Sequence, residues 1–300
     1  MAPGSASPDA ASPWRLAVLR AAPWLFIVIW SSGYVVAKVA AAHAEPLTFL
    51  LVRYAGVMLL MLALALAAGA QWPSARQAMH LAVSGIGIQA MYLGGVWVAV
   101  KQGMPAAVAA LIVNLQPVLT AAAGRFVGER VSGRQWLGLV LGLLGVALVV
   151  STKMGLTGMS AGVVALTVMS LLAMTGATLY QKRYVPDFDL RTGQAIQFVA
   201  SFLVTLPFAL AFESLHIEWN LATFLAMAWS VVVLTGGGIS LLFLMIRHGA
   251  ATQVTSYMYL VPAVTALMAW LMFDERLGAL AWLGMVVTIA GVALVVRRTS

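Results

Sequence analysis

Two closely similar apolar segments, 146 residues apart, constrain this chain more than any other feature. Residues 136–150 read WLGLVLGLLGVALVV and residues 282–296 read WLGMVVTIAGVALVV. A Glu-Arg pair precedes each segment at the same offset, at 129–130 and at 275–276. Neither segment contains an acid, a base or a thiol, so chemistry does not explain why it is repeated. Repeated halves built of hydrophobic helices are typical of transporters, whose substrate site lies where the halves meet.

The composition places the chain in a membrane. Hydrophobic residues make up 62% of the 300 residues and charged residues 9%, with a mean hydropathy of +0.98. A soluble domain carries about 25% charged residues. The sequence has no cysteine, which excludes disulfides and thiolate metal sites. The net charge of +8 would suggest a nucleic-acid partner on a soluble protein, but here it bears on membrane orientation.

The apolar residues divide into ten stretches, which predict an all-α polytopic membrane protein with ten transmembrane helices. Each stretch is close to the ~20 residues that cross a ~30 Å hydrocarbon core as a helix. No segment alternates in polarity as a barrel strand would. Residues 1–13 are small and polar and are expected to form a disordered tail. The predicted spans are 22–41, 48–68, 79–100, 106–126, 135–151, 160–180, 193–212, 222–246, 251–273 and 279–296.

The distribution of Lys and Arg predicts that both termini are cytoplasmic. With the N-terminus inside, only Lys101, Lys153 and Arg276 of the 17 basic residues fall in outer loops, and most of the others fall on the inner side. An even number of spans fits this arrangement. Five spans in each half, 14–151 and 152–300, would place the second half upside down relative to the first. The sequence therefore predicts two inverted five-helix repeats.

A cleaved signal peptide is an alternative interpretation of the first span. Arg15 and Arg20 precede an apolar run, and residues 42–44 resemble an A-x-A cleavage site. However, the run contains Lys38, and its removal would leave nine spans and unequal halves. We therefore expect the segment to remain as the first helix.

Short motifs at corresponding places in the two halves resemble those of a known family. The matching segments are Trp30–Gly33 (W-x-x-G), Pro46–Arg53, Leu115–Ala121 followed by Gly128-Glu129-Arg130, and Leu260–Ala266 followed by Asp274-Glu275-Arg276. Over about residues 22–296 the chain resembles the EamA-repeat branch of the drug/metabolite transporter superfamily, and within it most resembles an aromatic amino-acid exporter. The second half departs from the motifs of the first half in two places. Asp274 stands where the first half has a glycine before the glutamate, and the sixth span lacks the W-x-x-G motif.

This resemblance implies ten helices arranged as a cup. Spans three, four, eight and nine would surround a central cavity near the membrane midplane. Spans one, two, six and seven would form its walls, and spans five and ten would lie at the periphery.

Polar and aromatic side chains within the spans are the candidate substrate-binding residues, because a polar group in hydrocarbon is costly and usually faces a cavity or another polar group. Each has a structural alternative: Ser and Thr can bond the i−4 carbonyl of their own helix, Trp and Tyr can anchor at the interface, and Lys38 can snorkel to the headgroups. The candidates are Trp30, Ser31, Tyr34, Lys38, Gln89, Tyr92, Trp97, Asn114, Thr178, Gln181, Ser240, Ser256, Tyr257 and Tyr259.

Helix-breaking residues recur at corresponding places in the halves. Pro117 and Pro262 each remove a backbone hydrogen bond, and Gly236, Gly237 and Gly238 loosen the eighth span. Such paired breaks are typical of transporter gates and binding sites, although membrane helices also tolerate Pro and Gly for packing alone. We predict that these residues form hinges or gates.

Gly138, Gly142 and Gly145 follow the small-xxx-small pattern of a close contact between helices. We therefore predict that they pack against another helix and take no part in binding.

Several absences narrow the function. There is no phosphate-binding motif for ATP, and the G-x-G-x-x-A at 85–90 lies within a predicted span with no preceding strand. No nucleophile–base pair or metal-ligand set is present, so we expect neither an enzyme nor a cofactor. Every Asp and Glu falls in the tail, a loop or a span end, which argues against a buried carboxylate relay for protons.

The expected partners are the lipid bilayer and a small-molecule substrate, with no nucleic acid, and the oligomeric state is expected to be monomeric. The substrate predicted from these features is a neutral or zwitterionic amino acid with an aromatic or bulky apolar side chain, because Trp and Tyr rings would contact it. Export would proceed by alternating access, as uniport or with weak coupling. A broad-range drug or metabolite exporter of the same fold and, from another class, a channel or lipid scramblase remain alternatives.

Overall fold

The computed structural model describes residues 13–123, 132–157, 159–238, 240–241, 258 and 260–296, and within them the elements joined by loops are all helices. The helices are, in chain order, α1 (Pro13–His43), α2 (Pro46–Ala67), α3 (Ala75–Gly85), η1 (Ile86–Leu93), α4 (Gly94–Lys101), α5 (Ala106–Val113), α6 (Gln116–Ala123), α7 (Gly133–Thr157), α8 (Ala161–Tyr184), α9 (Leu190–Phe212), α10 (Leu221–Ala228), η3 (Trp229–Gly237), α13 (Val261–Phe273) and α14 (Ala279–Val296).

Each predicted span contains a helix in the described part of the chain. Five helices are long and apolar enough to cross a membrane, and five shorter apolar helices accompany them. Three labelled elements, α3, η1 and α4, run on as the single span Ala75–Lys101. The prediction of a polytopic helical membrane protein is confirmed.

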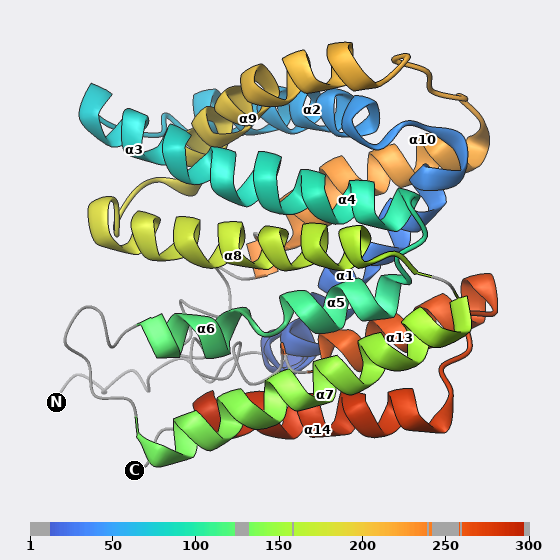
Figure 1. Cartoon of the computed structure of the whole chain (residues 1–300). Helices are drawn as coiled ribbons and strands as arrows, with labels where there is room; N and C mark the ends of the chain where they lie inside the picture. The colour runs from blue at the N-terminus through green and yellow to red at the C-terminus, as the bar shows by residue number, and fades with distance from the viewer. Residues whose placement is uncertain are drawn as a thin grey trace, which may run out of the picture.

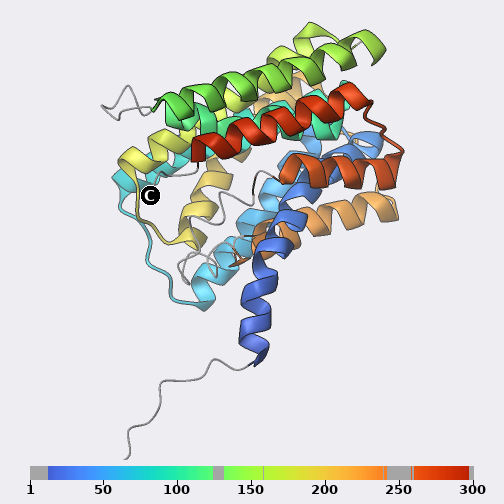
Figure 2. The ribbon, with the colours of Figure 1, turned by 90° about the horizontal axis from the view of Figure 1, so that it is seen from below.

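The helices form a bundle in which segments from the two halves of the sequence lie side by side (Figure 1). α2 packs against α9, α8 against η1 and α4, and α13 against α1 and α5. α7 and α14 pack along one edge of the bundle. The first turns of α1 project beyond the other helices (Figure 2).

The repeated apolar segments lie against each other as α7 and α14. A methyl group on Gly291 would lie 2.6 Å from the carbonyl oxygen of Gly138, and one on Gly145 would lie 2.5 Å from the carbonyl oxygen of Gly284. Since residue numbers rise along one helix as they fall along the other, the two helices run antiparallel. The predicted close contact of these glycines is confirmed, and it exists because only hydrogen fits between the backbones.

The departure of Asp274 from the family pattern has a local reason. Asp274 caps the C-terminus of α13 in the left-handed region, with φ 50° and ψ 32°. Glycine is the usual residue there, and Asp and Asn are among the few others that adopt this conformation readily. An aspartate can therefore end this helix where a glycine is expected.

The loop after α9 ties the halves together at the start of α2. The Glu213 carboxylate accepts hydrogen bonds from the backbone N–H of Leu47 at 2.9 Å and of Thr48 at 2.7 Å. Helix starts leave such N–H groups unpaired and favour a negative charge. Glu213 is thus bound in a capping role at the end of the bundle.

Asp189 caps the N-terminus of α9, and its removal should be measurable. Its side chain accepts a hydrogen bond from the Arg191 backbone N–H at 2.9 Å, and bonds from the Arg191 guanidinium hold the pKa of Asp189 below its usual value. We expect Asp189→Ala to lower the free energy of unfolding at pH 7 by ~0.5–2 kcal/mol.

This loss should depend on pH in one direction. The pKa of Asp189 is lower in the folded protein than in the unfolded chain. The Asp189 carboxylate therefore makes its full contribution to the free energy of unfolding above the unfolded pKa of about 3.9, and it loses this contribution as the pH falls through the folded pKa. Thermal unfolding in detergent between pH 7 and pH 3 would test this. Asp187→Ala, an exposed neighbour, is the control, and equal losses in both variants would contradict the prediction.

Candidate substrate-binding site

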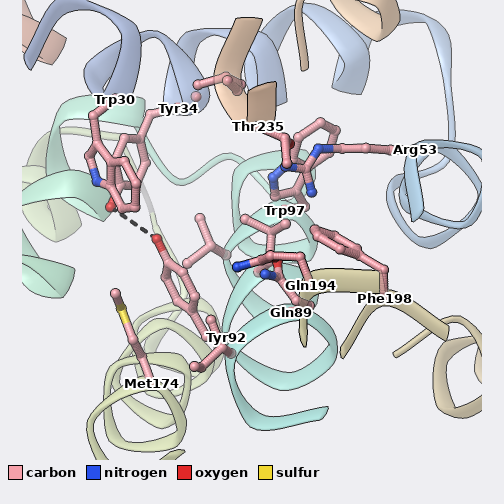
Figure 3. Close-up of a pocket in the computed structure, with 15 residues that line it drawn as sticks. Trp30, Tyr34, Arg53, Gln89, Tyr92, Trp97, Met174, Gln194, Phe198 and Thr235 are labelled. Atoms are coloured by element: carbon pink, nitrogen blue, oxygen red, sulfur yellow. Dashed lines mark hydrogen bonds between the residues drawn. The ribbon is translucent and has the colours of Figure 1, made fainter. Parts of the chain in front are cut away.

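A cavity of about 180 Å³ lies between helices of both halves of the chain (Figure 3). It is lined by α1, α2, η1 and α4 from the first half and by α8, α9 and η3 from the second. The lining residues are Trp30, Gly33, Tyr34, Arg53, Ile88, Gln89, Tyr92, Leu93, Val96, Trp97, Met174, Gln194, Phe198, Leu234 and Thr235.

Two of the lining elements are π-helices. η1 lies in the third apolar segment and η3 in the eighth, which are counterparts in the two halves. Together they contribute Ile88, Gln89, Tyr92 and Leu93 from one side, and Leu234 and Thr235 from the other. π-Helical turns are rare and are frequent at functional sites, so their position at the cavity supports a functional role.

Aromatic rings form much of the cavity wall. The hydroxyl oxygens of Tyr34 and Tyr92 lie 3.5 Å apart, as the dashed line in Figure 3 marks. Trp97 is held by stacking on Phe49, with ring centroids 5.0 Å apart. Trp30 lies one helical turn before Tyr34 on α1 and also faces the cavity (Figure 3). These rings offer a surface for an aromatic or bulky apolar group.

Three types of polar group interrupt this apolar wall. Gln89 of η1 and Gln194 of α9 place amide groups at the cavity, and Thr235 adds a hydroxyl. The third is the guanidinium of Arg53 from α2. No residue of the described lining is acidic.

Arg53 is buried, and the described residues satisfy few of its donors. The residue is 8% exposed, and within the described part of the chain its side chain donates one hydrogen bond, from Nη2 to the Thr235 hydroxyl at 3.4 Å. The guanidinium also lies over the ring of Phe198, 5.7 Å from its centroid. Its Nε and Nη1 atoms are buried and have no hydrogen-bond partner among the described residues.

Sequence reasoning missed Arg53 as a binding residue, because it was considered only for membrane orientation and as part of the Pro46–Arg53 motif. The signal was present, since an arginine within a run of some 20 apolar residues is a candidate functional residue by default. Gln194, Phe198, Met174 and Thr235 were also missed. A signal was present for Gln194, because it shares one face of its helix with Gln197 and Ser201, whereas nothing in the sequence sets Met174 apart from the other apolar residues of α8.

The structure brings five of the predicted substrate-binding residues together at the cavity, and it places others elsewhere. The five are Trp30, Tyr34, Gln89, Tyr92 and Trp97. Ser31 points instead toward α13, where its hydroxyl lies 3.4 Å from the Val261 carbonyl oxygen. Lys38 forms an ion pair with Glu275 and lies 4.7 Å from the centre of the Phe273 ring. Lys38 therefore contacts other side chains of the protein, whereas the sequence analysis considered a contact with the substrate or with lipid headgroups.

Four further candidates do not line this cavity. Asn114 is buried beside α5, and its amide nitrogen has no partner in the described residues. The Thr178 hydroxyl bonds the carbonyl of its own helix, at Met174, at 2.7 Å. Gln181 accepts a bond from Gln197 at 2.7 Å, and Ser240 bonds the Gly236 carbonyl at 2.6 Å. The remaining candidates, Ser256, Tyr257 and Tyr259, lie outside the described residues.

The helices around the cavity differ from those that the family resemblance implies. The described parts of α5, α6 and α13 contribute no lining residue, although spans four and nine were expected to surround the cavity. All of Ala106–Val113 is buried, because α5 packs closely against α13, α1 and α8 with small side chains. α7 and α14 also contribute none, as expected for peripheral spans.

The predicted hinge residues coincide with irregular backbone. The fourth span is interrupted between α5 and α6, at Asn114 and Leu115, just before Pro117. Pro262 stands in the first turn of α13, where a missing N–H is tolerated. Gly236 and Gly237 end the π-helix η3 and Gly238 follows it. Their role in movement stays a prediction.

A polytopic helical bundle that encloses a small aromatic and polar cavity defines a membrane transporter as the class of protein. The sequence pattern of the EamA-like transporter family matches the chain twice, over residues 21–151 and 161–297. The chain therefore belongs to the EamA-like transporter family, part of the drug/metabolite transporter superfamily.

Curated relatives cover nearly the whole chain at low identity. The chain is 26% identical to the uncharacterized inner membrane transporter YedA of Escherichia coli (strain K12), over 94% of this chain and 91% of the relative. It is 23% identical to a probable amino-acid metabolite efflux pump of the same organism, over 89% and 91%. It is 25% identical to the uncharacterized transporter YvbV of Bacillus subtilis (strain 168), over 95% and 93%.

A solved crystal structure has the same fold. The two chains align with a TM-score of 0.66 at 16% identity, covering 93% of this chain and 96% of the other.

Proposed function

We propose that this protein exports amino acids with aromatic or bulky apolar side chains across the inner membrane. The observation that carries the proposal is the convergence of Trp30, Tyr34, Tyr92, Trp97 and an amide, Gln89, on one cavity. The likeness to a probable amino-acid metabolite efflux pump and to an inner membrane transporter supports it. The overall sequence also resembles the aromatic amino-acid exporter YddG, and the relatives named above do not test that resemblance.

The size of the cavity favours an amino acid over a drug-sized compound. Its volume is about 180 Å³, whereas pockets that bury drug-sized ligands measure roughly 300–1,000 Å³. A broad-range drug exporter of the same fold is thus the weaker alternative. A channel or scramblase is also a weaker alternative, because a small cavity lined by a few specific polar groups is typical of a ligand-binding site.

The helix contacts support an inverted arrangement of the halves and hence alternating access. The counterpart of a helix is the one at the same position in the other half of the chain. By this rule α2 corresponds to α9, the α5–α6 segment to α13, and α7 to α14, and the members of each pair are in contact. The same rule converts the contact of α1 with η3 into that of α8 with η1, which also occurs. A pseudo-two-fold axis between the halves accounts for this pattern, with substrate bound near the axis.

The lining also bears on energy coupling. Proton-coupled carriers commonly use a buried carboxyl group as a relay, and no Asp or Glu belongs to the described lining. Glu275 is the acidic residue paired with Lys38. The proposed mechanism is therefore uniport or weakly coupled transport, with both termini in the cytoplasm as the distribution of basic residues predicts.

Transport by purified protein in liposomes tests this function. We expect saturable uptake of radiolabelled phenylalanine that unlabelled aromatic amino acids reduce and that a pH gradient leaves unchanged. Liposomes without protein are the control. Flux that rises linearly with concentration would favour a channel, and equal competition by many unrelated drugs would favour the broad-range exporter. Uptake that follows the pH gradient would contradict uncoupled transport.

A further inference from the structure

We infer that Arg53 binds the carboxylate of the substrate and that no acidic group of the cavity pairs with a substrate ammonium. The cavity therefore recognises small aromatic monocarboxylates whether or not they carry an amino group. This inference rests on the proposed function and deepens it, because it names the group of the amino acid that the protein recognises. It also widens the substrate class to acids that lack the ammonium group.

The first argument is the state of the Arg53 guanidinium. The residue is more than nine-tenths buried, and Nε and Nη1 have no hydrogen-bond partner in the part of the chain that the structure describes. The hydrogen bond that it does make there, to Thr235, is long at 3.4 Å. Figure 3 shows the guanidinium at the cavity, beside Thr235. A buried cation with unused donors is costly unless an anion pairs with it.

The second argument is the lack of an internal counter-charge. No acid belongs to the described lining, and two carboxylates that contact α1 and α2 are paired with other groups. Glu213 caps α2 and Glu275 pairs with Lys38. Since the described residues leave no carboxylate for Arg53, we infer that a ligand supplies the anion that completes this site. A carboxylate suits it, because the planar guanidinium can donate two parallel hydrogen bonds to its oxygens.

The third argument concerns the opposite end of an amino acid. Among the side chains of the described lining, an ammonium group would find neutral oxygens, from the amides of Gln89 and Gln194 and the hydroxyls of Tyr34, Tyr92 and Thr235. These groups also accept or donate bonds with water and with uncharged ligands. The ammonium is thus tolerated and is not required, while the aromatic walls hold the apolar part.

A set of four phenyl compounds separates these contributions. They are phenylalanine, 3-phenylpropionate, which lacks the ammonium, and phenylalaninamide and phenethylamine, which lack the carboxylate. We expect the two carboxylates to compete for labelled phenylalanine at similar concentrations. The compounds without a carboxylate should be at least about tenfold weaker. Ligand-induced shifts of the thermal unfolding temperature provide a second measurement that does not depend on transport.

Variants at Arg53 test the residue itself. Arg53→Gln should weaken the binding of both carboxylates at least about tenfold and remove the difference between phenylalanine and phenylalaninamide. Arg53→Lys keeps the charge and should restore part of the affinity. Arg76→Gln, which changes an exposed arginine on α3, should leave the affinities unchanged. The unfolding temperature without ligand should not fall in Arg53→Gln, since an unpaired buried charge is removed, whereas a structural role predicts a fall.

The outcomes separate this inference from the proposed function. Binding of 3-phenylpropionate but not phenylalanine, lost in Arg53→Gln, would support the carboxylate site and overturn amino-acid export. Equal binding of phenylalanine and phenylalaninamide, unchanged in Arg53→Gln, would overturn the carboxylate site and leave amino-acid export standing. Binding of none of the four compounds by folded protein would overturn both.

Discussion

Replacing Gly291 with alanine should destabilise the protein by ~1–3 kcal/mol, the cost of overpacking a close contact. The added methyl group would lie 2.6 Å from both the Gly138 carbonyl oxygen and the Gly142 nitrogen. These are backbone atoms in α7, so no side chain can rotate away, and the two helices must separate. Thermal unfolding in detergent measures the effect.

Gly176→Ala is the matched control, because Gly176 is also helical and no neighbouring atom lies within 4 Å of the position of its added methyl group. Alanine is favoured over glycine within a helix by about 1 kcal/mol. The two variants should therefore change stability in opposite directions. A loss at Gly176 as large as that at Gly291 would show that close packing of α7 on α14 is not the cause.

Replacing Met174 with tryptophan should reduce phenylalanine transport at least tenfold while the protein stays folded. Met174 is a flexible side chain of α8 that points into the cavity (Figure 3). An indole ring would occupy much of the about 180 Å³ available. Because the substrate and the new ring would compete for the same space, the loss should appear both in transport and in the ligand-induced shift of the unfolding temperature.

Met169→Trp is the control for this substitution. Met169 lies on the same helix but is 62% exposed on the outer surface of the bundle, where a tryptophan can be accommodated. Transport by this variant should match that of the unchanged protein. Equal loss in both variants would indicate a general effect of tryptophan on α8, and full transport by Met174→Trp would place the substrate elsewhere.

The candidate substrate-binding site contains residues that could be predicted from the sequence and residues that only the structure revealed. Trp30 and Tyr34 could be predicted because aromatic residues one turn apart within a motif are visible in the sequence, and both line the cavity. Ser31 and Lys38 belonged to the same prediction, yet they contact α13 and Glu275. A helix in a bundle has neighbours on several sides, so a polar residue on it can face another helix as readily as a cavity.

The sequence by itself determined the membrane setting, the ten apolar segments, the repeated halves and the close helix contact of the glycines in the fifth span, although only the structure shows that the partner is α14. These properties depend on local composition and spacing, because insertion of a segment into hydrocarbon is decided mainly by its own residues. The tertiary structure alone decided that Arg53, Gln194 and Met174 meet at one cavity, that η1 and η3 form π-helices there, and that Lys38 pairs with a residue 237 positions away. In helices that are apolar on nearly every face, rotation about the axis is set by packing against distant neighbours, and hydrophobic periodicity does not reveal it.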